Sequence, residues 1–291
     1  MLRQGPAALN EFLSIAELLA DASERLEAVS DSPRLDAELL LARAIDTPRS
    51  YLIAHPEDEP DDDAVRRFSD AIDMRASGQP LAYITGEKEF WSLDLKVTPA
   101  TLVPRPETEL LVEHAIGYVS RREPMRVLDL GTGSGAIALA IARERPLSDI
   151  VATDTSEDAL DVARHNARAH DIPNVSFAAG DWLDAVAGET FDVIVSNPPY
   201  VRADDPALAA LHAEPRSALV AGTDGLDDIR RIVSDAKPAS APGGALLIEH
   251  GADQGDAVAA LFSDAGWTGV RGIRDLAGLS RVTVGHAPDD A

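Results

Sequence analysis

The segment Phe191–Ser196, followed by Asn197-Pro198-Pro199-Tyr200, constrains the fold of this chain more than any other. Its first six residues form an apolar, β-branched run that is typical of a buried parallel strand. A strand that ends in asparagine and two prolines cannot continue as sheet or pass directly into a helix. The segment therefore predicts a stiff loop at the carboxyl end of a strand, which is the edge where open α/β sheets bind ligands.

Segments of strand and helix type alternate through the last two thirds of the chain. This alternation indicates βαβ units and a mostly parallel sheet, with an antiparallel closing pair at the end. We expect strands at residues 126–130, 150–154, 175–179, 191–196, 245–250, 269–273 and 281–284. The predicted fold class is therefore α/β, with a Rossmann-like sheet.

The first third of the chain has a different pattern. Apolar residues recur at helical spacing and predict helices over residues 14–29, 33–45 and 64–76, with Ser14 as the first N-cap. The period then changes, and residues 83–97 predict a short β-hairpin. We therefore expect a helical domain over residues 1–80, a hairpin and linker over 81–103, and a larger domain over 104–291.

Composition excludes several classes of protein and site. Hydrophobic residues make up 45% of the 291 residues, yet no apolar run approaches the ~20 residues that span a bilayer. The first residues lack the apolar core of a signal peptide. The chain has no cysteine, which excludes disulfides and thiolate metal ligands. We expect a cytoplasmic protein with no membrane partner and no metal site.

The charge balance is strongly acidic. Fifty acidic residues stand against 26 basic ones, for a net charge of −24, and Lys88, Lys96 and Lys237 are the only lysines. Lys and Arg supply much of the affinity for nucleic acids by neutralising phosphates, and a negative field repels a polyanion. The balance therefore disfavours direct nucleic-acid binding.

A glycine-rich loop follows the strand predicted at 126–130 and precedes a predicted helix. It reads Gly131-Thr132-Gly133-Ser134-Gly135. Glycines let the backbone turn sharply and approach a ligand closely, although a tight strand-to-helix turn alone would also explain them. A dinucleotide-binding fingerprint has its third glycine one residue later. The spacing therefore favours a ligand that lacks a pyrophosphate.

The next two strands also end in groups that suit a nucleoside. Asp154 ends the second strand, and its carboxylate can accept hydrogen bonds from both ribose hydroxyls. Asp181 and Trp182 follow the third strand, where Asp181 can accept from an exocyclic amine and Trp182 can stack on adenine. Each also has a structural explanation, a helix-start acid for Asp154 and a core side chain for Trp182. Taken together, the strand ends predict S-adenosylmethionine rather than NAD.

The Asn-Pro-Pro-Tyr loop can hold an amide or aromatic amine, whose nitrogen is a poor nucleophile. The side-chain oxygen of Asn197 and the backbone oxygen of Pro198 can accept its two N–H hydrogens, and proline fixes the direction of its own carbonyl. The Tyr200 ring would lie against the plane of the amide or amine that accepts the methyl group. The sulfonium already carries an activated methyl group, so positioning can supply much of the rate. We therefore predict catalytic roles for Asn197, Pro198 and Tyr200, and substrate binding by these three with Pro199.

Residues from about Leu35 to Val284 resemble the HemK/PrmC family of protein-(glutamine-N5) methyltransferases, which modify peptide chain release factors. One motif is Pro104-Arg105-Pro106-Glu107-Thr108-Glu109, whose Arg-Pro-Glu-Thr-Glu stretch is much more specific than the Asn-Pro-Pro-Tyr loop, which many amino-group methyltransferases share. The other motifs are Gly78-Gln79-Pro80-Leu81-Ala82-Tyr83-Ile84-Thr85-Gly86, Phe90-Trp91, Asp129 to Gly135, Asn197 to Tyr200, Glu214-Pro215 with Ala218-Leu219, Ile248-Glu249-His250-Gly251 and Arg274-Asp275-Leu276-Ala277-Gly278. Residues 1–13 form an extension without a match.

The resemblance implies a class I S-adenosylmethionine-dependent enzyme of translation termination. Its substrate would be the side-chain amide N5 of the glutamine in a release factor's Gly-Gly-Gln loop, and the helical domain would help to dock that protein. It implies that Asn197 to Tyr200 hold the glutamine. The implied cofactor contacts are Gly131 to Gly135, Asp154, Trp182 and Asn197.

Two other functions use the same features. A nucleic-acid methyltransferase could hold the N6 of adenine or the N2 of guanine in this loop after flipping the base. The acidic charge and the Arg105 to Glu109 stretch disfavour it. A non-enzymatic interaction module is disfavoured by the intact Asn-Pro-Pro-Tyr loop.

Overall fold

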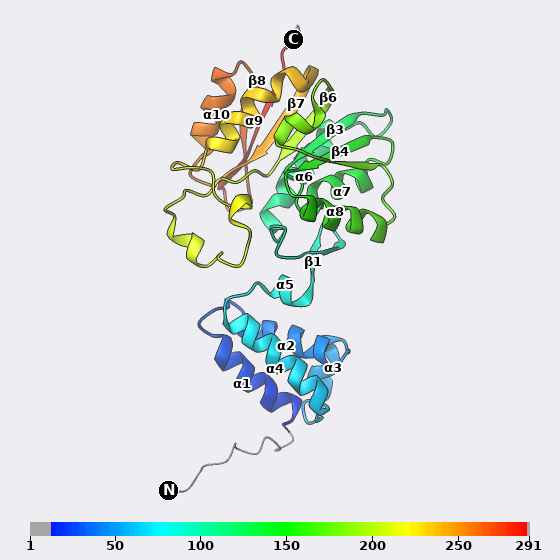
Figure 1. Cartoon of the computed structure of the whole chain (residues 1–291), viewed down its shortest axis with the longest axis vertical. Coiled ribbons are helices and arrows are strands. Elements are labelled where there is room, and N and C mark those ends of the chain that lie inside the picture. The colour runs from blue at the N-terminus through cyan, green and yellow to red at the C-terminus, as the bar shows by residue number, and fades with distance from the viewer. Residues whose placement is uncertain (1–12, 290–291) are drawn as a thin grey trace. The chain divides into compact units, whose positions relative to one another are not determined.

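The computed structural model describes residues 13–289 (Figure 1). The chain divides into two compact units, Met1–Thr85 and Gly86–Ala291. Residues 1–12, which hold most of the unmatched extension and the start of the expected helical domain, lie outside the described residues. No helix within 13–289 combines the length and the apolar character needed to cross a bilayer.

The first unit is helical, as the apolar spacing predicts. Ser14 caps the first helix through a reciprocal capping box with Glu17, which confirms the predicted N-cap. The last of the three predicted helices begins two residues earlier than expected, because the Asp61 side chain accepts from the Ala64 N–H at 2.7 Å and caps it. Two short helices, α3 and α5, were not predicted. The helices are α1 (Ile15–Leu26), α2 (Pro33–Ala44), α3 (Arg49–Ala54), α4 (Asp62–Ala76) and α5 (Leu81–Thr85).

The second unit contains a two-stranded hairpin and a seven-stranded sheet, which confirms the predicted α/β class. The sheet order is β5-β4-β3-β6-β7-β9-β8, with parallel pairing from β5 to β7 and antiparallel pairing of β9 on both sides. The strands are β1 (Glu87–Phe90), β2 (Leu93–Lys96), β3 (Arg126–Leu130), β4 (Asp149–Asp154), β5 (Val175–Ala179), β6 (Phe191–Ser196), β7 (Ser240–Glu249), β8 (Thr268–Arg274) and β9 (Ser280–His286).

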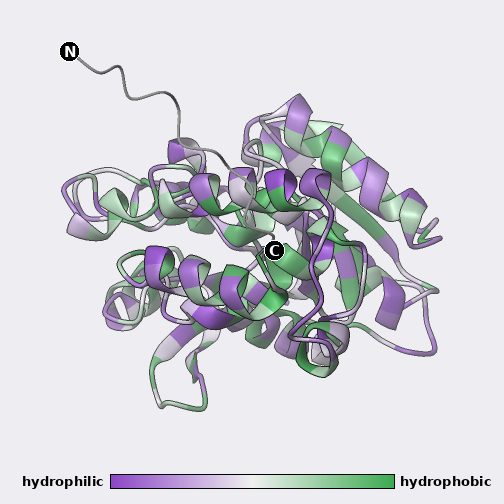
Figure 2. Cartoon of the chain, turned by 90° about the horizontal axis from the view of Figure 1, so that it is seen from below, coloured by the Kyte–Doolittle hydropathy of each residue, from purple (hydrophilic) through white to green (hydrophobic). Residues whose placement is uncertain are grey.

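Helices cover both faces of the sheet, so its central strands are buried on both sides (Figure 1). Alternate residues of β3 illustrate this: Val127 packs into the core with α6 and α7, whereas Leu128 packs into the core with α9 and α10. Figure 2 shows that the helices carry both hydrophilic and hydrophobic residues around their circumference. The helices of this unit are α6 (Glu109–Tyr118), α7 (Ala136–Glu144), α8 (Glu157–Ala169), α9 (Asp227–Asp235) and α10 (Gly255–Asp264).

One strand differs clearly from its prediction. We expected residues 245–250, but β7 begins at Ser240 and ends at Glu249. The added part contains Pro242-Gly243-Gly244, which disfavour a regular strand, and the ladder with β6 shifts its register there. Proline and glycine are tolerated in a strand at such an irregularity, so the strand continues through them.

The strand register brings the predicted loops to one edge of the sheet. Leu130 pairs with Thr153 on one side and with Ser196 on the other, and Ser196 pairs with Ile248. The residues that follow these strand ends therefore lie next to one another in space. They include the glycine-rich loop after β3, Asp154 at the end of β4, the Asn-Pro-Pro-Tyr loop after β6, and Glu249.

Candidate active site

The glycine-rich loop turns sharply between β3 and α7. Gly131, Gly133 and Gly135 have φ values of +73°, +55° and +85°, a region that favours glycine. A Cβ on Gly133 would meet no atom within 4 Å, so the loop leaves open space at that point. A Cβ on Gly131 would lie 3.1 Å from the ring of Trp182. The loop can therefore admit a ligand against its backbone, beside the indole ring.

A cavity of about 270 Å³ opens along this edge of the sheet. It brings together most of the residues predicted to bind the cofactor, although they come from four separate strand ends. The predicted residues that line it are Gly131, Thr132, Gly133, Ser134, Asp154, Asp181, Trp182, Asn197 and Pro199. Gly135, Pro198 and Tyr200 are not among its lining residues.

Backbone donors orient the Asp154 carboxylate at the end of β4. Its Oδ2 accepts from the Gly133 N–H at 2.9 Å, and its Oδ1 accepts from the Ser156 N–H at 2.9 Å. A carboxylate offers about four acceptor positions, so both oxygens retain capacity for a ligand's hydroxyl groups. The contact with Gly133 also ties the end of β4 to the glycine-rich loop.

A second carboxyl group, which is buried in the sheet, also contacts the glycine-rich loop. Asp129, in β3, is fully buried and accepts from the Thr132 hydroxyl at 2.6 Å and from the Ala138 N–H at 3.2 Å. Burial raises the pKa of Asp129 to about 7 despite these hydrogen bonds. Within residues 13–289 its other oxygen has no hydrogen-bond partner.

Asp181 and Trp182 line the cavity, but each also has a partner that the sequence did not indicate. Asp181 accepts from Arg231 of α9 at 2.5 Å, so one of its oxygens is already engaged. The side chain of Trp182 hydrogen-bonds Asp228, which is also in α9 and also lines the cavity. Burial raises the pKa of Asp228. Both partners lie about fifty residues further along the chain, where no local motif marks them.

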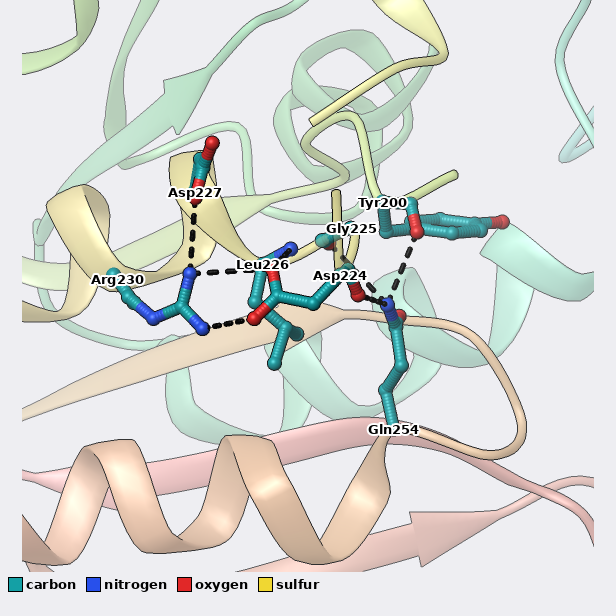
Figure 3. A network of polar contacts seen from close by, with 7 residues as sticks. All are labelled: Tyr200, Asp224, Gly225, Leu226, Asp227, Arg230 and Gln254. Carbon is teal, nitrogen blue, oxygen red and sulfur yellow. Dashed lines mark hydrogen bonds and ion pairs between the residues drawn. The ribbon is translucent and has the colours of Figure 1, made fainter. Parts of the chain in front are cut away.

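The acceptor loop is held at its far end by Gln254 (Figure 3). The Gln254 side-chain nitrogen donates to the Tyr200 carbonyl at 3.0 Å, and it also lies 3.3 Å from the Gly225 carbonyl and 3.4 Å from that of Asp224. Asp224 is in turn paired with Arg230 of α9. One buried amide thus joins the acceptor loop to the segment before α9, which limits the motion of Tyr200.

The Arg-Pro-Glu-Thr-Glu stretch contacts the site from a different part of the chain. Arg105 lines the cavity and is paired with Glu214, which is buried and also accepts from the Val103 N–H at 3.1 Å. Thr108, the last residue of the short 3-10 helix η1 (Pro106–Thr108), accepts from the Asn197 side-chain nitrogen at 3.1 Å. The stretch therefore reaches both the cavity and the acceptor loop.

Sequence reasoning assigned no role to Thr108 or Glu249, although both lie within quoted motifs. Glu249 is the last residue of β7 and is buried beside the Tyr200 hydroxyl, 3.5 Å from one carboxylate oxygen. A carboxylate that directly follows an apolar strand was a usable signal, since the same rule selected Asp154. Thr108 carried no comparable signal, because its contact with Asn197 spans 89 positions.

Comparison with known proteins agrees with this architecture. Residues 17–86 match the family model of the PrmC N-terminal domain, and residues 106–225 match that of the methyltransferase small domain. A solved methyltransferase structure from Pyrococcus furiosus superposes with a TM-score of 0.52 at 21% identity, covering 67% of this chain and 89% of that one. This similarity concerns the fold.

Full-length relatives are much closer in sequence. The release factor glutamine methyltransferase of Coxiella burnetii is 47% identical over 272 residues, which cover 94% of this chain and 98% of the relative. That of Escherichia coli is 44% identical over 270 residues, which cover 92% and 97%. Similarity at this level over almost the whole of both chains shows that this protein belongs to the release factor glutamine methyltransferase family.

Proposed function

We propose that this protein transfers a methyl group from S-adenosylmethionine to the side-chain amide N5 of the glutamine in the Gly-Gly-Gln loop of a peptide chain release factor. Family membership supports the reaction class. The observation that carries the proposal is the juxtaposition of the Asn-Pro-Pro-Tyr loop and the glycine-rich cavity at one edge of the sheet. Donor and acceptor of the methyl group can therefore meet there.

The cavity fits the proposed cofactor. Gly131 to Gly135 would accommodate it against the backbone, and Asp154 would accept from its ribose hydroxyls. Trp182 and Asp181 would contact the adenine, Trp182 through its ring and Asp181 through the carboxylate oxygen that Arg231 leaves free. S-adenosylmethionine supplies, when bound, a methyl group activated on a sulfonium sulfur.

The acceptor loop would orient the glutamine. The Asn197 side-chain oxygen and the Pro198 carbonyl would accept its two N–H hydrogens, which places the nitrogen and stabilises positive charge as it develops there. Pro199 and Tyr200 would border the side chain and exclude water. A well-oriented pair of reactants reaches effective molarities of ~10⁵–10⁸ M, so alignment can supply much of the rate.

The remaining parts of the chain have supporting roles in this proposal. The helical residues 1–80 would dock the release factor, and residues 104–291 would perform the chemistry. Residues 81–103 would form the hairpin and linker between these two domains. The separate matches of the two family models support such a division. The net charge of −24 favours a protein substrate over direct binding of nucleic acid. The protein would act in the cytoplasm, without a membrane partner.

One labelling experiment tests the proposal. The purified protein is incubated with methyl-labelled S-adenosylmethionine and, separately, with a bacterial release factor, ribosomal RNA or DNA. We expect the label on the release factor, and we expect it to disappear when the glutamine of the Gly-Gly-Gln loop is changed to alanine. Label on RNA or DNA instead would show that the substrate is a nucleic-acid amine.

A further inference from the structure

Two buried polar side chains, Thr108 and Glu249, contact residues of the acceptor loop. Thr108 is 4% exposed and Glu249 is 2% exposed. Glu249 ends β7, one residue beyond the pair Ser196–Ile248, so it lies beside the point where β6 turns into Asn197. Burying a carboxyl group costs free energy unless it is hydrogen-bonded, so the contacts that Glu249 makes in the interior are informative.

Thr108 connects the acceptor asparagine to this carboxyl group. Its hydroxyl oxygen accepts from the Asn197 side-chain nitrogen at 3.1 Å. The Thr108 side chain also faces the Glu249 carboxyl group closely enough to lower the pKa of Glu249. A hydroxyl has one proton to donate, whereas an ionised carboxylate can only accept. At a pH above about 7, where Glu249 is ionised, the Thr108 proton is therefore directed to Glu249, and the Thr108 lone pair is left for the NH₂ group of Asn197.

This arrangement gives the network a direction. The two ends of an asparagine amide have nearly the same shape, and only their hydrogen-bond partners determine which end points where. Since the Asn197 nitrogen is engaged by Thr108, its oxygen is the end left for a substrate N–H. The Tyr200 hydroxyl contacts the same carboxylate at 3.5 Å, which links a second loop residue to it.

We infer that Thr108 and Glu249 are positioning residues that keep the Asn197 side-chain oxygen directed toward the glutamine nitrogen. The inference rests on the proposed function, because it concerns the acceptor of the same methyl transfer. Glu249 is not among the residues that line the cavity, whereas Thr108 lines it next to Asn197. Each acts through Asn197, and the pair is assembled from the Arg-Pro-Glu-Thr-Glu stretch and from the end of β7.

The inference predicts a specific kinetic pattern. Thr108→Val keeps the shape of the side chain but removes the hydroxyl, so the Asn197 amide loses its preferred orientation. We expect turnover on the release factor to fall ~10-fold or more, with the cofactor dissociation constant changed less than about twofold. Thr108→Ser restores the hydroxyl and should restore most of the turnover. Glu249→Gln can donate as well as accept, which removes the direction of the network and should also lower turnover.

The assay uses the full-length protein at pH 8.5, with turnover measured by labelling of the release factor and cofactor binding measured by calorimetry. Thr268→Val is the matched control, because Thr268 is an exposed residue of β8 whose hydroxyl contacts only the His286 carbonyl among the hydrogen bonds described. Its turnover should equal that of the wild type. Tryptophan fluorescence checks that each variant is folded.

The outcomes separate the inference from the proposed function. Absence of release-factor labelling by the wild type would refute the proposed function and, with it, this inference. If the wild type labels the release factor but Thr108→Val retains full turnover, or loses cofactor affinity in equal measure, the positioning role is wrong. If Thr108→Val fails to fold, the Thr108→Ser and Glu249→Gln variants test the inference instead. Wild-type turnover in Glu249→Gln would refute the positioning role, whereas a loss of turnover with unchanged cofactor affinity would support it.

Discussion

Replacing Glu249 with glutamine should make the second unit more stable at alkaline pH while making the enzyme slower. Burial raises the pKa of the Glu249 carboxyl from 4.5 to about 7. The negative charge of Glu107 adds to this rise. Three neighbours oppose it, namely Thr108, Arg281 and the Tyr200 hydroxyl. In the unfolded chain the carboxyl ionises near its ordinary value. The native state therefore holds more protons than the unfolded state between pH 4.5 and about 7.

The sign and size of the effect follow from this difference. Stability falls with rising pH wherever the native state holds more protons, so the contribution of Glu249 is present below pH 4.5 and is lost as the pH passes about 7. A pKa rise from 4.5 to about 7 corresponds to about 3 kcal/mol. Most of this loss, about 2–3 kcal/mol, falls between pH 5 and pH 8.5. Glutamine does not titrate, so the variant lacks this loss.

Urea unfolding at several pH values between 5 and 8.5 measures the effect. The three tryptophans, Trp91, Trp182 and Trp267, all lie in the second unit, so their fluorescence reports on that unit alone. We expect the free energy of unfolding of the variant, relative to the wild type, to rise by about 2–3 kcal/mol from pH 5 to pH 8.5. Any packing change caused by the substitution is independent of pH, and the titration of Asp129 is common to both proteins.

The exposed Glu123 provides the control, since Glu123→Gln changes the same chemical group on the surface of the same unit. Its difference from the wild type, measured at the same pH values, is the baseline for the Glu249→Gln difference. A Glu249→Gln difference that changes with pH no more than this baseline would refute the claim that folding raises the pKa of this carboxyl group. A difference of opposite sign would mean that Glu249 is stabilised as a carboxylate.

Three further substitutions test the site. Asn197→Ala should lower turnover on the release factor at least ~10-fold while weakening cofactor binding much less, because the substrate nitrogen loses an acceptor; equal losses in labelling rate and in calorimetric affinity would contradict that role. Gly131→Ala, at a φ of +73° and with its new methyl group 3.1 Å from Trp182, should weaken cofactor binding and alter tryptophan fluorescence; an unchanged dissociation constant would refute close approach at this point. Gln254→Ala should lower the free energy of unfolding by about 2 kcal/mol and also reduce turnover, since the Tyr200 carbonyl loses its donor; full turnover in the destabilised variant would show that Gln254 does not constrain the acceptor loop.

Much of the fold could be predicted because its signals are local. The strands β3, β5 and β6 have the predicted bounds, since each is a short apolar run that ends at a glycine or at the Asn-Pro-Pro sequence. The prediction was less accurate where a tertiary contact overrides a local break, as in β7, where pairing with β6 carries the strand through Pro242. Short helices such as α3 were not predicted, because six residues are too few to show a helical repeat of apolar positions.

The candidate site divides along the same line. The glycine-rich loop, Asp154 and the acceptor loop could be identified because each directly follows a strand, and parallel strands end at a common edge. The hydrogen-bond partners of the site residues could not be identified from the sequence. Arg231 contacts Asp181 although 50 positions of the sequence separate them, and Thr108 contacts Asn197 although 89 positions separate them.

The sequence by itself therefore determined which backbone turns and which reactive groups occur at the ends of the strands, because steric limits on glycine and proline act within a few residues. Only the tertiary structure decided which buried side chains orient those groups. Such contacts depend on strand order and register, which arise from pairing between segments far apart in the chain.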